Sequence, residues 1–223
     1  CGYLEGRMAQ SLIAAPHHLI DAETYSGLIQ LGFRRSGKFA YRPHCEHCNA
    51  CVPVRIPVAE FQLSRSQRRA WMQHQGLTSE VIALNNYPEH LKLYTAYQRA
   101  RHTGGGMDAE DAEQYRNFLV QSNVETVMVE FREAGVLKMV SVVDIVRDGI
   151  SAVYTFYDCS DSGASYGTYN VLWLAQWCHS LGLPHLYLGY WIKDCRKMAY
   201  KQNFAPQEGL IDGEWVRLKA DQV

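Results

Sequence analysis

The fold is decided by a stretch that begins with Tyr154-Thr-Phe-Tyr-Asp158, continues through Ser160-Asp-Ser-Gly-Ala-Ser165 and reaches Leu186-Tyr-Leu-Gly-Tyr-Trp-Ile192. The apolar run from Gly167 to about Leu181 predicts a long helix between the loop and the last segment. The basic segment Asp194-Cys-Arg-Lys-Met-Ala-Tyr-Lys201 closes the unit as a short helix. The pattern therefore predicts a strand, a helix and a second strand in one sheet.

The start of the long helix lies beside strand ends that carry a carboxylate and tyrosines. A helix start supplies unpaired backbone N–H groups and a partial positive charge. Such a place suits the binding of an anion or the stabilisation of an oxyanion. Strand–helix–strand units are common in α/β domains, however, and the same tyrosines also suit an amphipathic core. The residues alone leave both interpretations open.

Strands precede this unit. Apolar segments at 126–132, 136–146 and 150–157 are separated by the turns Glu133-Ala-Gly135 and Arg147-Asp-Gly149, which predicts an antiparallel meander. The tail from Pro206 to Leu218 offers one more strand around Asp212-Gly213. A meander, a helix, a strand, a helix and a strand follow the order of an acyltransferase domain of the GCN5-related N-acetyltransferase type.

The N-terminal part reads as a smaller module. Asp21 predicts the start of a helix that Gly32 ends, and residues 33–43 predict a hairpin that turns at Ser36-Gly37. Residues 52–63 predict an extended strand whose prolines favour the edge of a sheet. Ser64 caps a basic helix to Trp71, and a further helix is expected from Glu89 to about Arg101. His102-Thr-Gly-Gly-Gly106 is expected to be a loop or a boundary.

We therefore predict an α+β protein with two parts. Residues 1–75 form a small cysteine-containing module, and residues 76–223 form an acetyltransferase-like mixed sheet with helices. A chain of 223 residues with 47% hydrophobic content is long enough to bury a substantial core. No apolar run approaches the roughly 18 residues that span a bilayer, so we expect a soluble protein without membrane contact. Seven cysteines at uneven spacing differ from a secreted disulfide scaffold and favour the cytoplasm.

Charge is distributed unevenly along the chain. Residues 33–75 contain eight Lys or Arg against two acidic residues, whereas residues 101–223 contain eleven basic and sixteen acidic residues. A basic face is what a polyanionic partner such as RNA requires, because phosphate contacts supply most sequence-independent affinity. A charged surface that is merely solvated gives the same pattern, and charge alone does not decide between the two.

His44-Cys-Glu-His-Cys-Asn-Ala-Cys51 is the most chemically distinctive run. Cys45, Cys48 and Cys51 are each three residues apart, a spacing that lets soft ligands converge on a zinc ion or an iron–sulfur cluster. Cys1 is the inferred fourth ligand, with His44 or His47 as the competitor. The alternative is a set of reduced structural thiols.

Several motifs together carry a family resemblance. They are Phe33-Arg-Arg-Ser-Gly, Tyr41-Arg-Pro-His-Cys with Cys48 and Cys51, Val52-Pro-Val-Arg-Ile, Ser64-Arg-Ser-Gln-Arg-Arg, Leu188-Gly-Tyr-Trp-Ile and Lys197-Met-Ala-Tyr-Lys201. Over nearly the whole chain they resemble the aminoacyl-tRNA–protein transferases of the N-degron pathway. The three spaced cysteines resemble the bacterial leucyl-transferring branch more than the eukaryotic arginyl-transferring branch.

The resemblance implies transfer of leucine from leucyl-tRNA to proteins or peptides that begin with Asp or Glu, which tags them for degradation under the N-end rule. Between Asp158 and the long helix, the chain also lacks the Gln/Arg-x-x-Gly-x-Gly/Ala loop that binds the pyrophosphate of coenzyme A in acetyltransferases. Asp161-Ser-Gly-Ala-Ser-Tyr-Gly-Thr168 stands there instead, and the helix start with Thr168 suits the terminal phosphate or ribose of a tRNA. No cofactor is required for the transfer itself.

The transfer requires little catalysis by side chains, because an aminoacyl ester is already activated. The α-amine has a reference pKa of about 7.7–8.0, so a fair minority is neutral near pH 7. Positioning the amine against the ester and aiming donors at the oxyanion supplies most of the acceleration. The candidates for a proton relay are Asp158, Tyr157 and Tyr190, although each also has a structural interpretation.

Recognition of an acidic first residue calls for a fixed positive group, preferably a guanidinium. The sequence offers several candidates and does not choose among them: Arg34, Arg35, Arg42, Arg55, Arg196 and Lys201. The basic helix offers contacts to the phosphates, sugars or bases of tRNA through Arg65, Arg68, Arg69 and Trp71.

Three alternatives remain at this level. One is arginine as the donor amino acid, a second is an N-acetyltransferase that uses acetyl coenzyme A, and the third is a metal-containing RNA-binding module without catalysis. Binding of coenzyme A distinguishes the second, and a transfer assay distinguishes the others.

Overall fold

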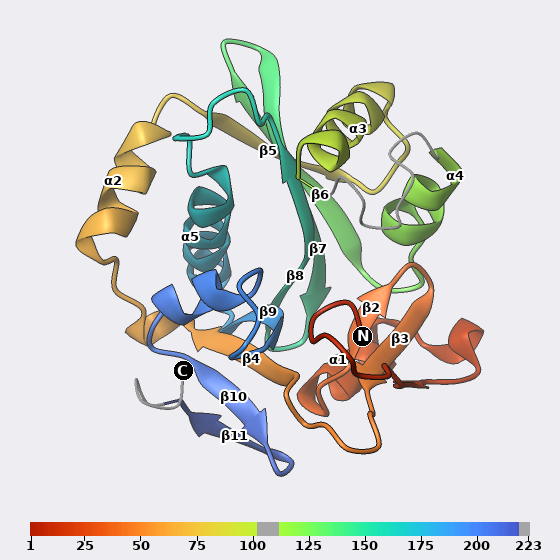
Figure 1. Ribbon diagram of the computed structural model, residues 1–223. Coiled ribbons are helices and arrows are strands. Elements are labelled where there is room, and N and C mark those ends of the chain that lie inside the picture. The colour runs from red at the N-terminus through yellow and green to blue at the C-terminus, as the bar shows by residue number, and fades with distance from the viewer. Residues whose placement is uncertain (102–111, 219–223) are drawn as a thin grey trace.

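A computed structural model describes residues 1–101 and 112–218, and Figure 1 shows their arrangement. The strands are β1 (Ser11–Ile13), β2 (Arg34–Ser36), β3 (Phe39–Pro43), β4 (Val52–Pro57), β5 (Thr78–Ala83), β6 (Thr126–Glu133), β7 (Val136–Val146), β8 (Gly149–Tyr157), β9 (His185–Trp191), β10 (Glu208–Ile211) and β11 (Glu214–Arg217). The helices are α1 (Ala22–Gln30), α2 (Arg65–Gln73), α3 (Pro88–Arg101), α4 (Ala112–Tyr115) and α5 (Tyr166–Ser180). Shorter helical turns are η1 (His17–Leu19), η2 (Val58–Glu60), η3 (Arg116–Val120) and η4 (Ala199–Asn203).

In the described part of the chain, eight strands form the main sheet in the order β11-β10-β4-β9-β8-β7-β6-β5, and β1, β3 and β2 form a small second sheet. Within these residues β8 and β9 run parallel, and the other neighbouring strands run antiparallel. The meander predicted from the glycine turns is present as β6, β7 and β8, and α5 crosses over to β9. The predicted α+β class, with a mixed sheet and helices, is confirmed.

The position predicted for residues 52–63 is wrong, because β4 is an internal strand between β9 and β10. The prolines are tolerated because of where they fall. Pairing with β10 involves only Val54 and Arg55, so Pro53 and Pro57 lie outside that ladder. On the other side, a bulge between Val54 and Arg55 shifts the register against β9.

The sheet also crosses the boundary predicted near residue 75. Strand β4 belongs to the first part of the chain, whereas its neighbours β9 and β10 belong to the second. The tail contributes a hairpin, β10 and β11, where one strand was expected, and Asp212 and Gly213 with positive φ form its turn. Strand β5 pairs with β6 at the far edge and was not expected. The loop expected at 102–106 lies outside the described residues.

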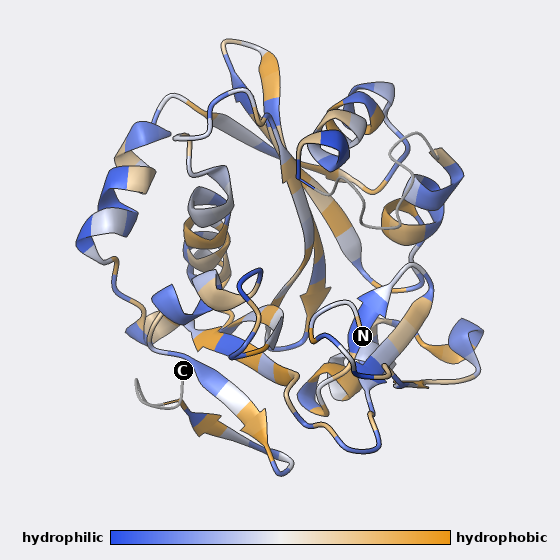
Figure 2. Cartoon of the chain, in the orientation of Figure 1, coloured by the Kyte–Doolittle hydropathy of each residue, from blue (hydrophilic) through white to orange (hydrophobic). Residues whose placement is uncertain are grey.

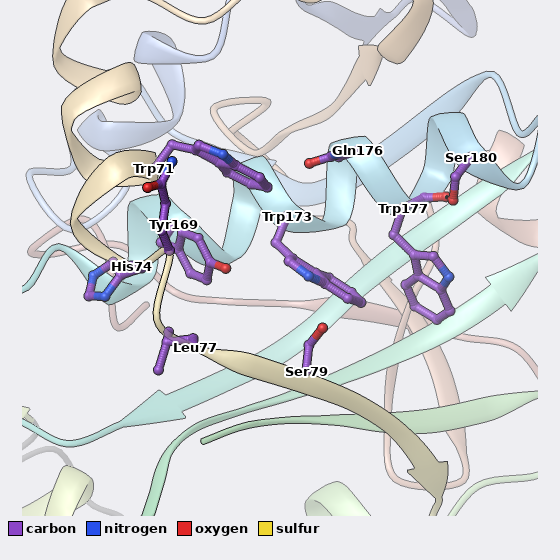
Figure 3. A pocket seen from close by; sticks show the side chains of 10 residues that line it. Trp71, His74, Leu77, Ser79, Tyr169, Trp173, Gln176, Trp177 and Ser180 are labelled. Carbon is purple, nitrogen blue, oxygen red and sulfur yellow. Dashed lines mark hydrogen bonds between the residues drawn. The ribbon is translucent and has the colours of Figure 1, made fainter. Parts of the chain in front are cut away.

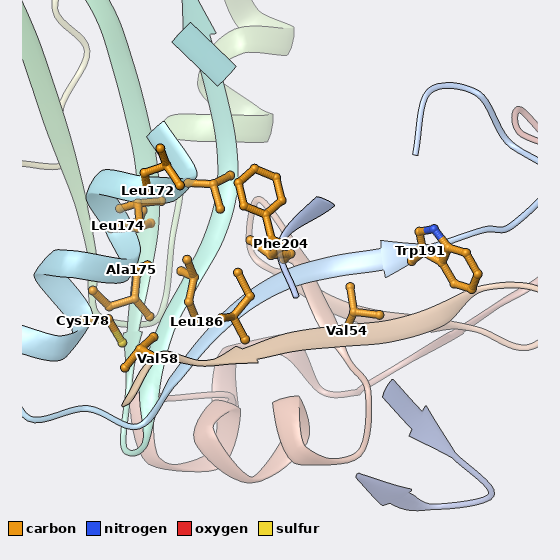
Figure 4. Packing of buried hydrophobic residues seen from close by; sticks show 14 residues of the cluster. Val54, Val58, Leu172, Leu174, Ala175, Cys178, Leu186, Trp191 and Phe204 are labelled. Carbon is orange, nitrogen blue, oxygen red and sulfur yellow. The ribbon is translucent and has the colours of Figure 1, made fainter. Parts of the chain in front are cut away.

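Helix α5 and helix α2 cover one face of the main sheet, and α3, α4 and α1 lie over the other (Figure 1). The inner side of α5 packs on β4 and β9 in a buried cluster that includes Leu174, Cys178 and Leu186 (Figure 4). Figure 2 shows α2 largely in hydrophilic colours and the central strands largely in hydrophobic ones. The two helices therefore differ in role, since α5 is a core element and α2 presents a polar outer surface.

Local sequence explains where the helices begin. Asp21 accepts a hydrogen bond from the Thr24 backbone N–H at 2.8 Å, and Gly32, with φ of +83°, follows the end of α1. At α2, Ser64 and Gln67 form a reciprocal capping box. Both caps were predicted and are confirmed. No helix in the described ranges combines the length and the apolar character that crossing a bilayer requires.

A buried histidine in the first turn of α3 should make the free energy of unfolding depend on pH. The Nε2 atom of His90 lies 2.6 Å from Glu130 Oε1, and burial lowers the pKa of His90. The unfolded chain takes up this proton near pH 6.5, and the folded chain takes it up at lower pH. The free energy of unfolding should therefore be greatest above about pH 6.5 and fall as the pH drops below that value.

Urea unfolding of the wild type and of His90→Gln, each at about pH 7.5 and about pH 5, measures this effect. Glutamine keeps a donor for Glu130 and does not titrate, so the variant should lose less stability on acidification. An equal loss in both proteins would show that His90 does not contribute to it.

Candidate active site

The candidate site lies where β8 and β9 separate. The two strands pair at three positions only, Gly149 with His185, Ile150 with Leu186 and Ser151 with Tyr187. Gly149 permits this close pairing, because an added Cβ would lie 2.1 Å from the His185 carbonyl oxygen. Farther along, β8 stays paired with β7 and β9 stays paired with β4. The sheet therefore opens between the C-terminal halves of β8 and β9.

Arg34 reaches into this opening from β2. Its Nη2 donates to the Ala152 carbonyl oxygen of β8 at 2.5 Å. On the other side, the guanidinium packs against Gly189 of β9, where an added Cβ would lie 3.3 Å from Cζ. The residue is only 8% exposed, and its Nη1 has no hydrogen-bond partner among residues 1–101 and 112–218. The positive φ of Gly189 and its missing side chain make room for the guanidinium.

Lys201 from η4 is a second buried cation at the same place. It is 6% exposed, and its Nζ donates to the Tyr190 carbonyl oxygen at 2.5 Å. Burial, followed by repulsion from Arg34, lowers the pKa of Lys201 to about 7. We call Arg34 and Lys201 the cation pair.

A polar pocket of about 430 Å³ adjoins the opening, and we call it the helix-start pocket. Its lining includes Ser64 and Ser66 of the α2 start, Ser165 and Thr168 of the α5 start, and Tyr200. Ser64 caps α2, whereas the Ser165 side chain makes no capping hydrogen bond to α5. The first N–H groups of α5 therefore keep their capacity to bind an anion or an oxyanion.

The three residues predicted for proton transfer lie in different environments. The Tyr157 hydroxyl lies near the α5 start, 3.8 Å from where a Cβ on Gly167 would be. Asp158 accepts from the Ser160 backbone N–H and from Lys138 Nζ, and the Ser160 hydrogen bond lowers the pKa of this carboxyl. The Tyr190 hydroxyl donates to the Gly32 carbonyl oxygen at 2.8 Å, away from Tyr157.

The residues predicted to bind an acidic substrate also lie in different places. Arg35 is buried in an ion pair with Asp144, and Arg55 is paired with Glu208. Arg42 donates to the Leu31 carbonyl oxygen and lies over Phe33. Arg196 is exposed between β9 and η4. Of the six candidates, the structure brings Arg34 and Lys201 together at the opening.

The predicted tRNA contacts lie in three places. Arg65, Arg68 and Arg69 are exposed on α2. Trp71 turns inward, with its ring 5.3 Å from that of Tyr169. It lines an aromatic groove of about 450 Å³ along the later turns of α5, together with Trp173 and Trp177 (Figure 3). Thr168 lines the helix-start pocket instead.

The cysteine run forms a tight turn in which Cys45 and Cys48 pair across an isolated bridge. Arg7 donates to Cys48 Sγ at 2.9 Å, and the thiols of Cys45 and Cys48 contribute to a raised pKa of Cys51, although burial is the larger cause. In residues 1–101 and 112–218, no three His, Cys, Asp or Glu side chains are arranged as metal ligands. Three thiols on one loop are a donor set that suits zinc or an iron–sulfur cluster, and the metal site stays a prediction.

Sequence reasoning missed Tyr200, Ser66 and the role of Gly189. Lys197-Met-Ala-Tyr-Lys201 is one of the motifs of the family resemblance, but nothing in it indicates that Tyr200 lies beside the α5 start. Ser64 was recognised as a cap, and the proximity of its helix start to that of α5 depends on tertiary packing between distant segments.

Comparisons with known proteins agree with the resemblance carried by the motifs. The family model "Arginine-tRNA-protein transferase, N terminus" matches residues 1–69, and "Arginine-tRNA-protein transferase, C terminus" matches residues 89–211. An aspartate/glutamate leucyltransferase of Methylobacillus flagellatus is 76% identical over 215 residues, which cover 96% of this chain and 87% of that protein. One of Nitrosospira multiformis is 56% identical over 219 residues, covering 98% and 87%.

Among solved structures, a crystal structure of FemX matches with a TM-score of 0.49 at 9% identity, covering 78% of this chain and 61% of that one. The identities to the curated relatives and the two family models decide the assignment. The chain is an aminoacyltransferase and belongs to the aminoacyl-tRNA–protein transferase family, as its motifs predicted.

Proposed function

We propose that the protein transfers leucine from leucyl-tRNA to the α-amine of proteins or peptides whose first residue is Asp or Glu. The product is marked for degradation by the N-degron pathway, and the reaction takes place in the cytoplasm. The observation that supports this proposal best is the uncapped start of α5, which faces a polar pocket beside the opening between β8 and β9.

The reaction joins two substrates without a covalent intermediate on the protein. The neutral α-amine attacks the ester carbonyl carbon, so that a C–N bond forms and the C–O bond to the terminal ribose breaks. The amine loses a proton and the ribose hydroxyl gains one. Backbone N–H groups at the α5 start stabilise the oxyanion, and the helix-start pocket holds the ribose and its phosphate.

Tyr157 is the best placed of the proton-relay candidates. Its hydroxyl lies at the α5 start, where the leaving ribose oxygen would stand in this arrangement. Asp158 accepts a hydrogen bond from Lys138 Nζ at 3.0 Å, and the Tyr190 hydroxyl donates to the Gly32 carbonyl oxygen, so both groups already have partners. We therefore assign the relay to Tyr157.

The deciding experiment incubates the purified protein with labelled leucyl-tRNA and a peptide that begins with Asp, and runs arginyl-tRNA in parallel. We expect label in the Asp peptide from leucyl-tRNA and much less from arginyl-tRNA. A matched peptide that begins with Ala is the control. Transfer from arginyl-tRNA alone would reassign the donor, and tight binding of coenzyme A without any transfer would contradict the proposal.

The exposed arginines of α2 should bind tRNA through its phosphates. Arg65→Ala and Arg69→Ala should each weaken tRNA binding and lower the slope of log Kd against log salt by about one, because each phosphate contact releases about one counterion. Filter binding at several salt concentrations measures both quantities.

Arg147→Ala is the matched control, since Arg147 is an exposed arginine in the turn between β7 and β8 and pairs with Glu23. It should leave the slope unchanged. An equal change of slope in all three variants would remove α2 as the tRNA-binding surface.

A further inference from the structure

Arg34 differs from its neighbour Arg35 in β2 and from the partly buried Arg55 in β4. Arg35 has Asp144 and Arg55 has Glu208, whereas no ion pair is present for Arg34 among the described residues. Its guanidinium donates to a main-chain oxygen, and Nη1 is buried without a partner in the described part of the chain. A buried charge without a counter-ion is unfavourable, so such a group indicates a place that an anion completes.

Lys201 also favours an anion-binding place here, because it adds a second positive charge beside Arg34. Its ammonium group donates to the Tyr190 carbonyl oxygen and, in the described part of the chain, has no carboxylate partner. Two like charges buried together repel each other. An anion between them relieves the repulsion and the desolvation at once.

The place of the cation pair relative to the helix-start pocket limits what the anion is. Tyr200 lines that pocket and also lies within electrostatic range of Arg34 and Tyr157. In the proposed arrangement the tRNA end approaches from the exposed side, where α2 and the pocket lie. The cation pair lies deeper, inside the sheet opening, at 8% and 6% exposure. A small carboxylate on a short side chain fits this buried position better than a bulky ribose phosphate.

We propose that Arg34 and Lys201 together bind the side-chain carboxylate of the acceptor's first residue and so select Asp and Glu. This inference rests on the proposed function, because it assigns the specificity of the same site. A neutral side chain leaves two buried cations unpaired, and a basic side chain adds a third positive charge. Discrimination therefore comes from the unfavourable state of the site when the wrong residue occupies it.

The kinetic test compares peptides that begin with Asp and Asn, which differ in charge but hardly in shape. Arg34→Met and Lys201→Met each remove one charge and keep most of the side-chain length. Each should lower kcat/KM for the Asp peptide by about 10- to 100-fold, because a hydrogen bond to a charged group is lost. The Asn peptide should change little, so the preference for Asp collapses. Lys201→Arg should restore part of it.

A second measurement needs no catalysis and uses the intact wild-type protein. The Lys201 ammonium is followed by NMR of 13C-labelled lysine while pH is varied, with Lys201→Arg used to assign the signal. Arg34 of β2 and Cys195, which precedes η4, are the charged and titratable groups that affect Lys201. Binding of the Asp peptide should raise the titration midpoint, and the Asn peptide should not.

The outcomes separate the two proposals. A loss of kcat/KM that is equal for Asp and Asn peptides, or a midpoint that the Asp peptide does not move, would overturn the assignment. Loss of tRNA affinity in Arg34→Met with an unchanged preference for Asp would assign the cation pair to a phosphate instead. Absence of transfer by the wild type contradicts the proposed function, whereas the NMR titration still tests the carboxylate site.

Discussion

Thr168→Glu should lower kcat/KM for leucyl-tRNA by about 100-fold or more, because placing like charges together at an interface costs several kcal/mol. Thr168 lies in the first turn of α5 and lines the helix-start pocket. A carboxylate there would occupy the free N–H groups and repel the ribose phosphate. The same carboxylate should stabilise the helix by about 0.3–1 kcal/mol, since an acid at a helix start is favourable.

Activity and stability should therefore change in opposite directions, which a general folding defect does not produce. Thr168→Gln is the matched control, because it has the same size as the glutamate and no charge. Steady-state transfer assays and thermal unfolding of both variants measure the two effects. Equal losses of activity in the Glu and Gln variants would show that size, and not charge, is what the pocket rejects.

Asp144→Ala should lower the free energy of unfolding by about 3–5 kcal/mol, because it leaves a buried guanidinium without its partner. Asp144 is fully buried, lies 2.7 Å from Arg35 Nη2 and accepts from Thr126 Oγ1 at 2.6 Å. Arg35 also donates from Nη1 to the carbonyl oxygens of Gly37 and Gln121. These contacts join β2 to β7 and hold the strand that carries Arg34.

The double variant Arg35→Met with Asp144→Leu distinguishes the contribution of the ion pair from that of the buried hydrocarbon parts of the two side chains. Replacement of both charges by apolar groups is often nearly neutral, so the double variant should be more stable than Asp144→Ala alone. Urea unfolding gives all three values. A double variant that is less stable than the single one would mean that the pair itself supplies net stabilisation.

Much of the fold was predictable because its signals are local. Turns at Gly135 and Gly149 separate three apolar strands, and the caps at Asp21 and Ser64 mark two helix starts. The error at β4 arose because proline in a strand favours an edge, whereas here Pro53 and Pro57 fall outside the ladder with β10. Strand β5 was missed because it is mostly exposed at the sheet edge and lacks a clean alternation.

The site was predictable as a set of residue types but not as a geometry. The sequence supplied six basic candidates for an acidic substrate. Whether an arginine is free depends on partners far along the chain, such as Asp144 for Arg35 and Glu208 for Arg55. No local pattern shows which guanidinium lacks a carboxylate. The family resemblance predicted the reaction. Only the tertiary structure indicates which cationic side chains remain available to bind an acidic substrate.

The internal position of β4 has a consequence for synthesis on the ribosome. This strand is translated early, yet both of its neighbours come from the last fifth of the sequence. The nascent chain must therefore carry an unpaired apolar strand until β9 and β10 have been made, which raises contact order and slows folding. A fragment that ends before β9 has no partner for that strand, so release of truncated chains should favour aggregation over a stable half-protein.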